Sequence, residues 1–571
     1  DVYAEVEFYP SERRVAVKGH YLIENKNDKP LVKFLMFWSG GKNRSFDYSL
    51  PNSTEVDRDD KFYTTWVKFD KPLQPGETSR LDFTYERANR GFVDRGADTR
   101  VVENGSFVNN SEIFPHFGYN GGLQLADRHE RRKRGLPAPE RLPKLEDESQ
   151  YGTNFIGKEA DFINFETIVS TSEEQFAISP GYLQKQWKEN GRSYYHYKMD
   201  APIFNFVAFL SGEYQRTAEE YKGIPIEVYH HPEHTMNVDR MILSVKDSLD
   251  YFGQQFSPYQ HRQVRIIEFP RYARFAQSFS NTIPYSEDIG FIADLRDQDV
   301  IDYVYFVTAH EMAHQWWGHQ ITPANVQGSA VLSETLSEYS AYMVMEKKLG
   351  KDQLRQFLKY EMDRYLRGRS GEVIEEMPLY RAENQQYIHY QKGGVVMYAL
   401  RDIVGEAPVN RALKKLVEEF GFKADPYPTT LDLLRHLKTE ISSEHHDLID
   451  DLFKRITIFD LKVTDATAKK ISDGEYQLDV TVEARKFYAD GQGQEQEVEL
   501  DFAFDIGAFS KNPDDAKGSD HVIHMQKYKI KKGENTFSIK LDRLPLYVGI
   551  DPYIKMIDRN SNDNLKRVTI N

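Results

Sequence analysis

Hydrophobic and polar residues alternate through most of the first 220 residues. Val2, Ala4, Val6 and Phe8 are apolar at every second position, and runs such as FYTTWVKF and RLDFTYE follow between clusters of Asn, Asp, Gly and Pro. Successive side chains of a strand point to opposite faces, so this spacing gathers the apolar set on one buried face. The pattern predicts an antiparallel, sandwich-like β domain over residues 1–220.

From Ile224 onward, the apolar residues recur at the three- and four-residue spacing of helices. Helical segments are predicted at residues 237–256, 332–349, 352–367, 390–404, 409–420 and 430–441, with a short strand at 265–269. Gly350, Gly405 and Gly421 follow three of these segments, and glycine commonly stands where a helix ends. We predict a mixed α+β domain over residues 221–455.

Strand-like alternation returns in the last part of the chain. It is visible in ITIFDLKVTDA, YQLDVTVEARKF, EVELDFAFDIGAF and NTFSIKLD. This pattern predicts an antiparallel β-sandwich over residues 456–571. The predicted fold class is therefore multidomain, with a β-rich N-terminal domain, a mixed middle domain and a C-terminal β-sandwich.

Composition narrows the class of protein. The chain has 571 residues, of which 40% are hydrophobic, and no run reaches the ~18 to 20 apolar residues of a membrane span. The net charge of −15 (74 basic minus 89 acidic residues) disfavours nucleic acid as a partner. Cysteine is absent, which excludes disulfides and thiol chemistry. Because the chain starts at Asp1 rather than Met, we expect a processed or excised piece, from which an anchor could have been removed.

The motif H-E-M-A-H at residues 310–314 is the first sign of a chemical function. On a helix, His310 and His314 lie one turn apart on the same face, close enough to share one cation, and neutral imidazole suits zinc. Glu311 lies about 100° further round, where it can accept a proton from a water bound to the metal. The motif predicts the centre of a zinc hydrolase, although a purely structural histidine pair would also fit the motif alone.

A catalytic zinc usually has three protein ligands, and Glu334 is our candidate for the third. It would lie in the first turn of the predicted helix at 332–349. Ser, Gly, Pro and Asn are frequent between residues 321 and 330, and such a loop lets the second helix fold back against the first. Glu338, one turn later, is predicted to be an ordinary surface acid, with a role in orienting a ligand histidine as the alternative.

Together, these residues resemble the aminopeptidase N (membrane alanyl aminopeptidase) family of gluzincins. H-E-M-A-H-Q-W-W-G is similar to the family's H-E-x-x-H-x-W-F-G, and L-S-E-T is similar to its L-N-E-G. The resemblance implies a thermolysin-like catalytic domain with one Zn²⁺ per chain, held by His310, His314 and Glu334, and Glu311 as general base. Nineteen residues separate His314 from Glu334, one more than in the family, and we expect a one-residue loop insertion.

A second element of the resemblance is Y-Q-K-G, which begins at Tyr390. It is similar to the family's Y-E-K-G, whose tyrosine directs its hydroxyl at the developing oxyanion. The resemblance implies that Tyr390 is catalytic. Most of the 35 tyrosines must serve packing, so the interpretation depends on the zinc motif, and Tyr387 and His389 are weaker candidates.

The chain departs from the family at the G-A-M-E-N motif, whose glutamate binds the amino terminus of the substrate. F-A-Q-S-F at residues 275–279 takes its place, followed by Tyr285 and Glu287 at the end of the next strand. Ser278 then stands where the glutamate is expected. A neutral hydroxyl forgoes a charge-assisted contact worth about 1.5 to 3 kcal/mol, so recognition of the amine should weaken.

This departure leaves the substrate contacts open. The candidate substrate-binding residues are Gln277, Ser278 and Glu287. Glu268, Glu287 and Glu112 are each predicted to be an ordinary solvated or capping acid, and a carboxylate that supplies the missing charge is the alternative for each.

The resulting prediction is a zinc-dependent metallopeptidase that hydrolyses peptide bonds with zinc-activated water, with aminopeptidase action on peptides as the first choice. Because of Ser278, a zinc endopeptidase or a hydrolase with altered N-terminal recognition is the alternative. The third hypothesis is a non-catalytic peptide-binding or transporter-associated module, although such a binder has no need of Glu311.

The partners and location follow from a narrower resemblance. Residues 324–348 are similar to a bacterial branch in which the peptidase domain is joined to ABC-transporter permease segments. This similarity implies membrane-transporter segments outside this chain and an extracytoplasmic position in a bacterial membrane protein. The compartment, the oligomeric state and the preferred side chain of the substrate stay open.

Overall fold

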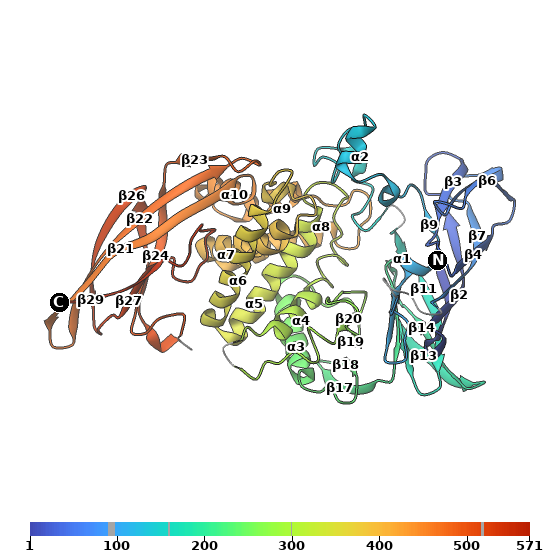
Figure 1. Ribbon diagram of the computed structural model, residues 1–571, viewed down its shortest axis with the longest axis horizontal. Coiled ribbons are helices and arrows are strands. Elements are labelled where there is room, and N and C mark those ends of the chain that lie inside the picture. The colour runs from blue at the N-terminus through green and yellow to red at the C-terminus, as the bar shows by residue number, and fades with distance from the viewer. Residues whose placement is uncertain (90–97, 158–159, 298–299, 516–518) are drawn as a thin grey trace. The chain divides into compact units, whose positions relative to one another are not determined.

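The computed structural model describes residues 1–89, 98–157, 160–297, 300–515 and 519–571 (Figure 1). Two compact units are present. The first comprises Asp1–Glu140, Ile156–Lys246 and Tyr259–Asp294, and the second comprises Arg141–Phe155, Asp247–Pro258 and Leu295–Asn571. The sequence places boundaries at residues 220 and 455 instead, and this three-domain division stays a prediction.

The N-terminal part of the first unit is a β-sandwich. Its larger sheet has the order β13-β14-β11-β1-β2-β7-β4, and its smaller sheet has the order β5-β6-β3-β9. The apolar positions of β1, namely Val2, Ala4, Val6 and Phe8, are buried and share one core with Val67 of β6. The prediction of a β-rich N-terminal region is confirmed. The strands are β1 (Val2–Tyr9), β2 (Arg14–Glu24), β3 (Leu31–Phe37), β4 (Arg44–Ser49), β5 (Ser53–Asp59), β6 (Thr64–Leu73), β7 (Thr78–Ala88), β9 (His116–Phe117), β11 (Phe165–Ser172), β13 (Tyr182–Glu189) and β14 (Arg192–Lys198).

The first unit also contains a four-stranded sheet, a small sheet of β8 (Ser106–Asn109), β12 (Phe176–Ile178) and β16 (Ala208–Gly212), and a two-stranded sheet of β10 (Phe162–Ile163) and β15 (Ile203–Phe204). The four strands, in the order β17-β18-β19-β20, are β17 (Gln215–Tyr221), β18 (Ile224–His230), β19 (Val264–Phe269) and β20 (Thr282–Ser286). The pairs β18/β19 and β19/β20 are parallel. Parallel neighbours require a long crossover, and helix α3 (Val238–Gln255) lies in the one from β18 to β19. The carboxyl ends of these three strands therefore meet at one edge.

The second unit contains the described helices between residues 300 and 455. They are α4 (Tyr303–Ala313), α5 (Leu336–Leu349), α6 (Lys351–Ser370), α7 (Gly393–Val404), α8 (Glu406–Phe420), α9 (Thr430–Glu440) and α10 (His446–Phe453). Gly350 and Gly405 have φ values of 85° and 92°, which explains why glycine ends α5 and α7. Gly421 ends α8 with an ordinary φ of −57°. The prediction of a helical catalytic region is confirmed.

The C-terminal part of the second unit is a second sandwich. One sheet has the order β23-β22-β21-β29, with β26 also paired to β22, and the other has the order β25-β24-β27-β28. Leu461 and Val482 of the first sheet share a core with Ile506 and Val548 of the second, so the predicted C-terminal β domain is confirmed. The strands are β21 (Ile456–Ser472), β22 (Glu475–Ala489), β23 (Glu495–Val498), β24 (Asp501–Phe509), β25 (Val522–Lys531), β26 (Gly533–Leu541), β27 (Tyr547–Ile550), β28 (Leu565–Arg567) and β29 (Thr569–Ile570).

The length and hydropathy of a helix determine whether it could cross a membrane. Among the described residues, no helix combines the length and the apolar character that a membrane span requires.

A buried lysine links the C-terminal sandwich to α7 within the second unit. Lys555 Nζ lies 2.7 Å from Asp402 Oδ2 of α7 and also contacts Asp505 of β24. Burial alone would raise the pKa of Asp402, but Lys555 and Lys527 lower it to about 2. The lysine therefore compensates two carboxylates that are largely withdrawn from water.

We expect Lys555→Met to destabilise the second unit, because it removes the buried one of the two lysines, Lys555 and Lys527, that pair with these carboxylates. Removing one partner of a buried ion pair typically costs about 3 to 5 kcal/mol. The measurement is the free energy of unfolding in urea. Lys529→Met is the matched control, since Lys529 pairs with Asp501 at the surface with 71% of its side chain exposed. A loss for Lys555→Met no larger than for this control would contradict the prediction.

Candidate metal centre

Helix α4 carries both histidines of the H-E-M-A-H motif. Asp302 caps the start of the helix by accepting a hydrogen bond from the Tyr305 amide at 3.0 Å. His310 lies in the last turn, and His314 is the residue that caps the end. The two Nε2 atoms are 3.0 Å apart. The structure therefore brings these two predicted ligands together at one point.

Glu334 reaches the same point from a π-helical turn, η4 (Val331–Thr335), which leads into α5. Its Oε2 lies 3.4 Å from His310 Nε2 and 3.2 Å from His314 Nε2. A π-helical turn holds about one more residue than an α-helical turn, so it can accommodate the additional residue between His314 and Glu334. A one-residue insertion in the loop stays the prediction from the sequence.

The outer nitrogen of each histidine lies near an oxygen. His314 Nδ1 lies 2.9 Å from the Trp317 carbonyl and 3.1 Å from Ser337 Oγ. His310 Nδ1 lies 3.4 Å from Glu338 Oε1. A carbonyl can only accept hydrogen bonds, so the Trp317 contact favours a proton on Nδ1 of His314. The Nε2 atoms of both rings face the Glu334 carboxylate, an orientation typical of histidines that bind a metal.

The donor atoms at this centre fit a zinc ion. Two ring nitrogens 3.0 Å apart can share one cation, and a carboxylate largely withdrawn from water is costly without a compensating charge. Within the described chain, the buried Oε2 atoms of Glu334 and Glu311 have no hydrogen-bond partner. One atom from each of His310, His314 and Glu334 lies within 4.8 Å of the others. Two imidazoles and one carboxylate are a common ligand set of catalytic zinc.

Glu311 lies beside this centre and is buried, as is His310. Burial raises the pKa of Glu311 to about 7, while nearby His314 opposes the shift. For His314 itself, burial is outweighed by the charge of Glu334, which raises the pKa to about 9. A carboxyl with a pKa near neutrality exchanges protons readily, so Glu311 has the character of a general base.

Tyr390 approaches the centre from a second π-helical turn, η6 (Tyr387–Lys392), which leads into α7. Its ring centroid is 5.9 Å from that of His310. Burial and the hydrogen-bonded Glu334 carboxylate raise the pKa of Tyr390, so its hydroxyl keeps its proton and can donate. Its neighbours have other contacts, since Tyr387 donates to Glu372 at 3.0 Å and the His389 carbonyl accepts from Thr335.

Glu338 is buried rather than exposed. Only 7% of its side chain is accessible, and its carboxylate faces His310 Nδ1. Its interpretation as a surface acid is therefore wrong. Burial and the nearby Glu361 carboxylate raise its pKa, and Glu361 was not singled out from the sequence. Ser337 was also missed, although its position three residues after Glu334 places it on the same helical face.

The predicted substrate-binding residues lie in the first unit. Gln277 and Ser278 belong to a turn closed by isolated bridges between Ala276 and Tyr285 and between Phe279 and Thr282. Ser278 is buried with 7% exposure. Glu287 follows β20 and lies in a separate group with Glu268 and His234. A role of Gln277, Ser278 and Glu287 in substrate binding stays a prediction.

The described geometry defines a class of protein. Two helical histidines and a glutamate, with a buried glutamate and a tyrosine beside them, are an arrangement typical of metal-dependent hydrolases. Residues 242–455 match the peptidase family M1 domain. The matched segment includes all five of these residues.

Several known proteins are similar to this chain. The leucyl aminopeptidase of Saccharolobus solfataricus is 26% identical over 164 residues, which are 28% of this chain and 20% of that protein. Human endoplasmic reticulum aminopeptidase 2 is 21% identical over 218 residues, which are 35% of this chain and 22% of that protein. The matched segments thus span less than a third of the length of these relatives.

The fold also resembles a solved structure, an M1 zinc metallopeptidase from Deinococcus radiodurans. The TM-score is 0.52 at 18% identity, and the match covers 79% of this chain and 92% of that one. At this level of identity the likeness concerns the fold.

The π-helical turns η4 and η6 pack closely beside Gly393. A Cβ atom on Gly393 would lie 2.2 Å from Thr335 Oγ1, next to Glu334. Gly393→Ala should push the turns apart, costing about 1 to 3 kcal/mol of stability through overpacking. It should also weaken zinc binding by about 10- to 100-fold, as loss of a supporting contact does. The measurements are the unfolding midpoint and the zinc Kd in competition with a chelator.

Gly253→Ala is the matched control for this substitution. Gly253 also lies in a helix, and a Cβ there would meet no atom within 4 Å. It should leave zinc binding unchanged and stabilise the helix by up to about 1 kcal/mol. Equal zinc affinities for the two variants would contradict the proposed role of the close approach.

Proposed function

We propose that this chain is a zinc metallopeptidase that hydrolyses peptide bonds, and that it acts as an aminopeptidase on peptides. The observation that supports this proposal is the meeting of His310, His314 and Glu334 at one point, beside Glu311 and Tyr390. The M1 domain and the names of the similar proteins, leucyl aminopeptidase and endoplasmic reticulum aminopeptidase 2, agree with it.

His310, His314 and Glu334 would hold one zinc ion per chain. When bound, zinc supplies a Lewis acid that lowers the pKa of coordinated water and polarises the scissile carbonyl. The hydrogen bond of His314 Nδ1 with the Trp317 carbonyl and the approach of Glu338 to His310 Nδ1 favour the required orientation of both imidazoles before any ligand arrives. Binding therefore needs little rearrangement of the histidines.

Glu311 supplies the proton transfers of the proposed reaction. With a pKa of about 7, its carboxylate takes a proton from the attacking water as the oxygen forms its bond to the carbonyl carbon. The carboxylic acid then gives that proton to the leaving amine as the C–N bond breaks. The base is regenerated in the same cycle, so no further group is needed to balance the protons.

Tyr390 stabilises the charge that develops on the substrate. Its high pKa keeps the hydroxyl protonated, so it donates a hydrogen bond to the carbonyl oxygen as that oxygen becomes negative. Such a donor acts most strongly in the transition state and therefore raises kcat. Tyr390 is held near Glu334 by the packing of the two π-helical turns.

Ser278 favours a second candidate function. Because a neutral hydroxyl stands where a carboxylate is expected, the chain could cleave peptides without requiring a free amino terminus. The alternative is then a zinc endopeptidase or a hydrolase acting on blocked termini. A non-catalytic peptide-binding or transporter-associated module is a third function, which would hold zinc without turnover.

One experiment separates these functions. We expect purified wild-type protein to cleave a peptide with a free amino terminus and to leave its acetylated twin intact. Glu311→Gln should lower kcat by about 100- to 10,000-fold, the range of general acid–base catalysis, at unchanged zinc content. Glu444→Gln is the control, since that side chain is 74% exposed and should retain full activity.

The other outcomes are equally informative. Cleavage of both peptides would replace the aminopeptidase proposal with the endopeptidase or blocked-terminus alternative. Bound zinc with no cleavage across a broad peptide panel would replace it with the binding module. Full activity of Glu311→Gln would contradict the assignment of the base.

A second prediction concerns the oxyanion. Tyr390→Phe should lower kcat by about 100- to 1,000-fold with little change in KM, as expected when one transition-state donor is lost. Tyr387→Phe is the matched control from the same turn, because its hydroxyl contacts Glu372 instead. A larger effect for Tyr387→Phe than for Tyr390→Phe would show that the tyrosines are assigned in the wrong order.

A further inference from the structure

A second group of metal-binding side chains lies in the first unit, at the carboxyl ends of the parallel strands. His231 and His234 follow β18, Glu268 stands at the end of β19, and Glu287 directly follows β20. The register pairs Glu268 with Tyr285 and Phe269 with Ser286, so the last residues of β19 and β20 lie side by side. Ligands commonly bind at this edge of a parallel sheet, where strand ends bring polar residues together.

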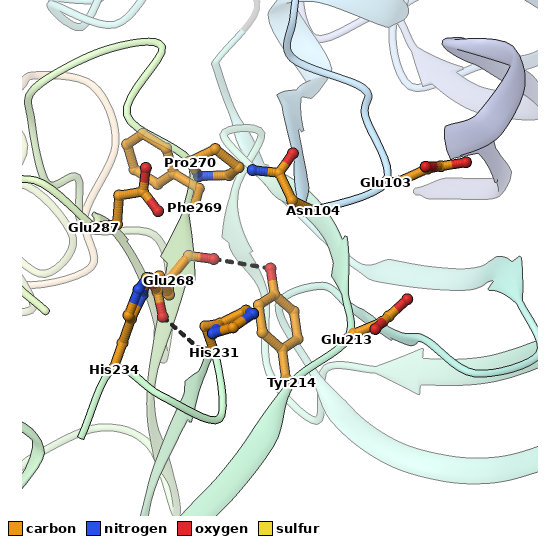
Figure 2. A pocket seen from close by; sticks show the side chains of 10 residues that line it. All are labelled: Glu103, Asn104, Glu213, Tyr214, His231, His234, Glu268, Phe269, Pro270 and Glu287. Carbon is orange, nitrogen blue, oxygen red and sulfur yellow. Dashed lines mark hydrogen bonds and ion pairs between the residues drawn. The ribbon is translucent and has the colours of Figure 1, made fainter. Parts of the chain in front are cut away.

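The side chains of this group converge closely. One ligand atom from each of His234, Glu268 and Glu287 lies within 4.8 Å of the others. Glu268 Oε1 contacts His234 Nδ1 directly. In Figure 2, His234, Glu268 and Glu287 gather on one side of the pocket, and His231 lies beside Glu268. Three segments far apart in sequence thus supply the atoms of one site.

Backbone groups hold these side chains in place. Glu268 Oε2 accepts a hydrogen bond from the His231 amide at 2.6 Å, and Glu287 Oε1 accepts one from the Arg271 amide at 3.0 Å. The Tyr214 hydroxyl donates to the Glu268 carbonyl at 2.8 Å, as Figure 2 shows. The turn from His231 to His234 is closed by a backbone hydrogen bond of 2.9 Å. Metal ligands fixed by such outer contacts lose little freedom when the ion binds.

The pocket around them is acidic. It has a volume of about 350 Å³ and is lined by His231, His234, Glu268, Glu287, Glu103, Asn104, Glu213, Tyr214, Phe269 and Pro270. Four of these ten residues are glutamates, and none is Lys or Arg. Glu268 is only 4% exposed, so its charge is largely withdrawn from water. A buried carboxylate in acidic surroundings is stabilised by a bound cation.

We propose that His234, Glu268 and Glu287 bind a divalent first-row transition-metal ion, such as zinc, at a site separate from the H-E-M-A-H centre. Two carboxylates and one imidazole neutralise a dication and supply oxygen and nitrogen donors that such ions accept. The pocket has room for water at the remaining coordination positions. None of these residues belongs to the first centre, so the proposal does not depend on the peptidase function.

A simple hydrogen bond between His234 and Glu268 is the alternative explanation. That contact alone needs neither Glu287 nor an acidic pocket. The approach of a second carboxylate to the same imidazole adds a like charge that a cation, either a proton on the imidazole or a metal ion, must offset. Glu287 is therefore the residue whose removal best separates the two explanations.

The test is the zinc content of the full chain, expressed with added zinc, desalted and measured by elemental analysis. We expect two zinc ions per wild-type chain and one in Glu287→Gln. Asp288→Asn is the matched control, because it removes the same charge from the adjacent position, where Asp288 pairs with Arg274. It should keep both ions. Removing a direct ligand should weaken zinc binding at the second site by more than about 100-fold, because the loss of an outer contact alone already weakens metal binding by about 10- to 100-fold.

A variant of the first centre provides the complementary measurement. His310→Ala combined with His314→Ala should retain one zinc ion, and adding Glu287→Gln to it should remove that ion. With cobalt in place of zinc, the remaining site should give visible absorption bands that Glu287→Gln abolishes. Circular dichroism checks that each variant is folded. The cobalt spectrum of the folded variant with His310→Ala and His314→Ala then tests the second site while its own ligands are unchanged.

Several results would overturn the proposal. One zinc ion in the wild type and none in the histidine variant would show that the second group binds no metal. Loss of the second ion in Asp288→Asn as well would show that the ion is held by general surface charge. Two ions in Glu287→Gln with a raised KM for free-amine peptides would assign Glu287 to substrate binding, as the sequence predicts.

Discussion

The catalytic region depends on one electrostatic constraint: the ligand atoms of His310, which is buried, and of His314 and Glu334, which are half-buried, face one another. The two Nε2 atoms lie 3.0 Å apart with a carboxylate at 3.2 to 3.4 Å, and a cation among them compensates the charge of that carboxylate. The surrounding structure holds this arrangement in place. The Trp317 carbonyl contacts His314 Nδ1, and the Glu338 carboxyl group lies beside His310 Nδ1, so that both Nε2 atoms face inward.

Two π-helical turns provide the geometry that this constraint requires. Glu334 lies on η4 and Tyr390 on η6, and both turns precede regular helices. A π-helical turn re-aims one side chain without interrupting the helix, which is why such turns are frequent at functional sites. Gly393 lets η6 and η4 approach closely, and the Thr335 hydroxyl joins them by donating to the His389 carbonyl. Catalytic groups on rigid helices are positioned more accurately than groups on loops.

The second group of candidate ligands lies at the ends of strands instead of on helices. His234, Glu268 and Glu287 come from the ends of parallel strands, whose shared edge collects polar residues from distant parts of the sequence. Backbone amides orient both carboxylates there, whereas side chains and a carbonyl orient the histidines of the first centre. The fold thus contains two candidate metal centres, one on helices and one on a sheet edge, each preorganised by outer contacts.

Local patterns determined much of this protein. Alternation in residues such as Val2, Ala4, Val6 and Phe8 predicted the two β regions, and helical spacing with Gly350 and Gly405 predicted most helices within a few residues. The four-residue spacing of His310 and His314 places them on one helical face regardless of the rest of the chain. Short-range periodicity is fixed by backbone geometry, so the sequence alone reveals it.

Contacts between distant residues were decided only by the tertiary structure. The burial of Glu338 and the supporting contact of Ser337 depend on how α5 packs against α4, and no local pattern reports that packing. The π-helical turns differ from α-helix by one hydrogen-bond step, which residue spacing does not resolve. Glu268 and Glu287 each resemble an ordinary acid in sequence. They meet His234 because parallel strands align their carboxyl ends, and this alignment is a property of the folded sheet.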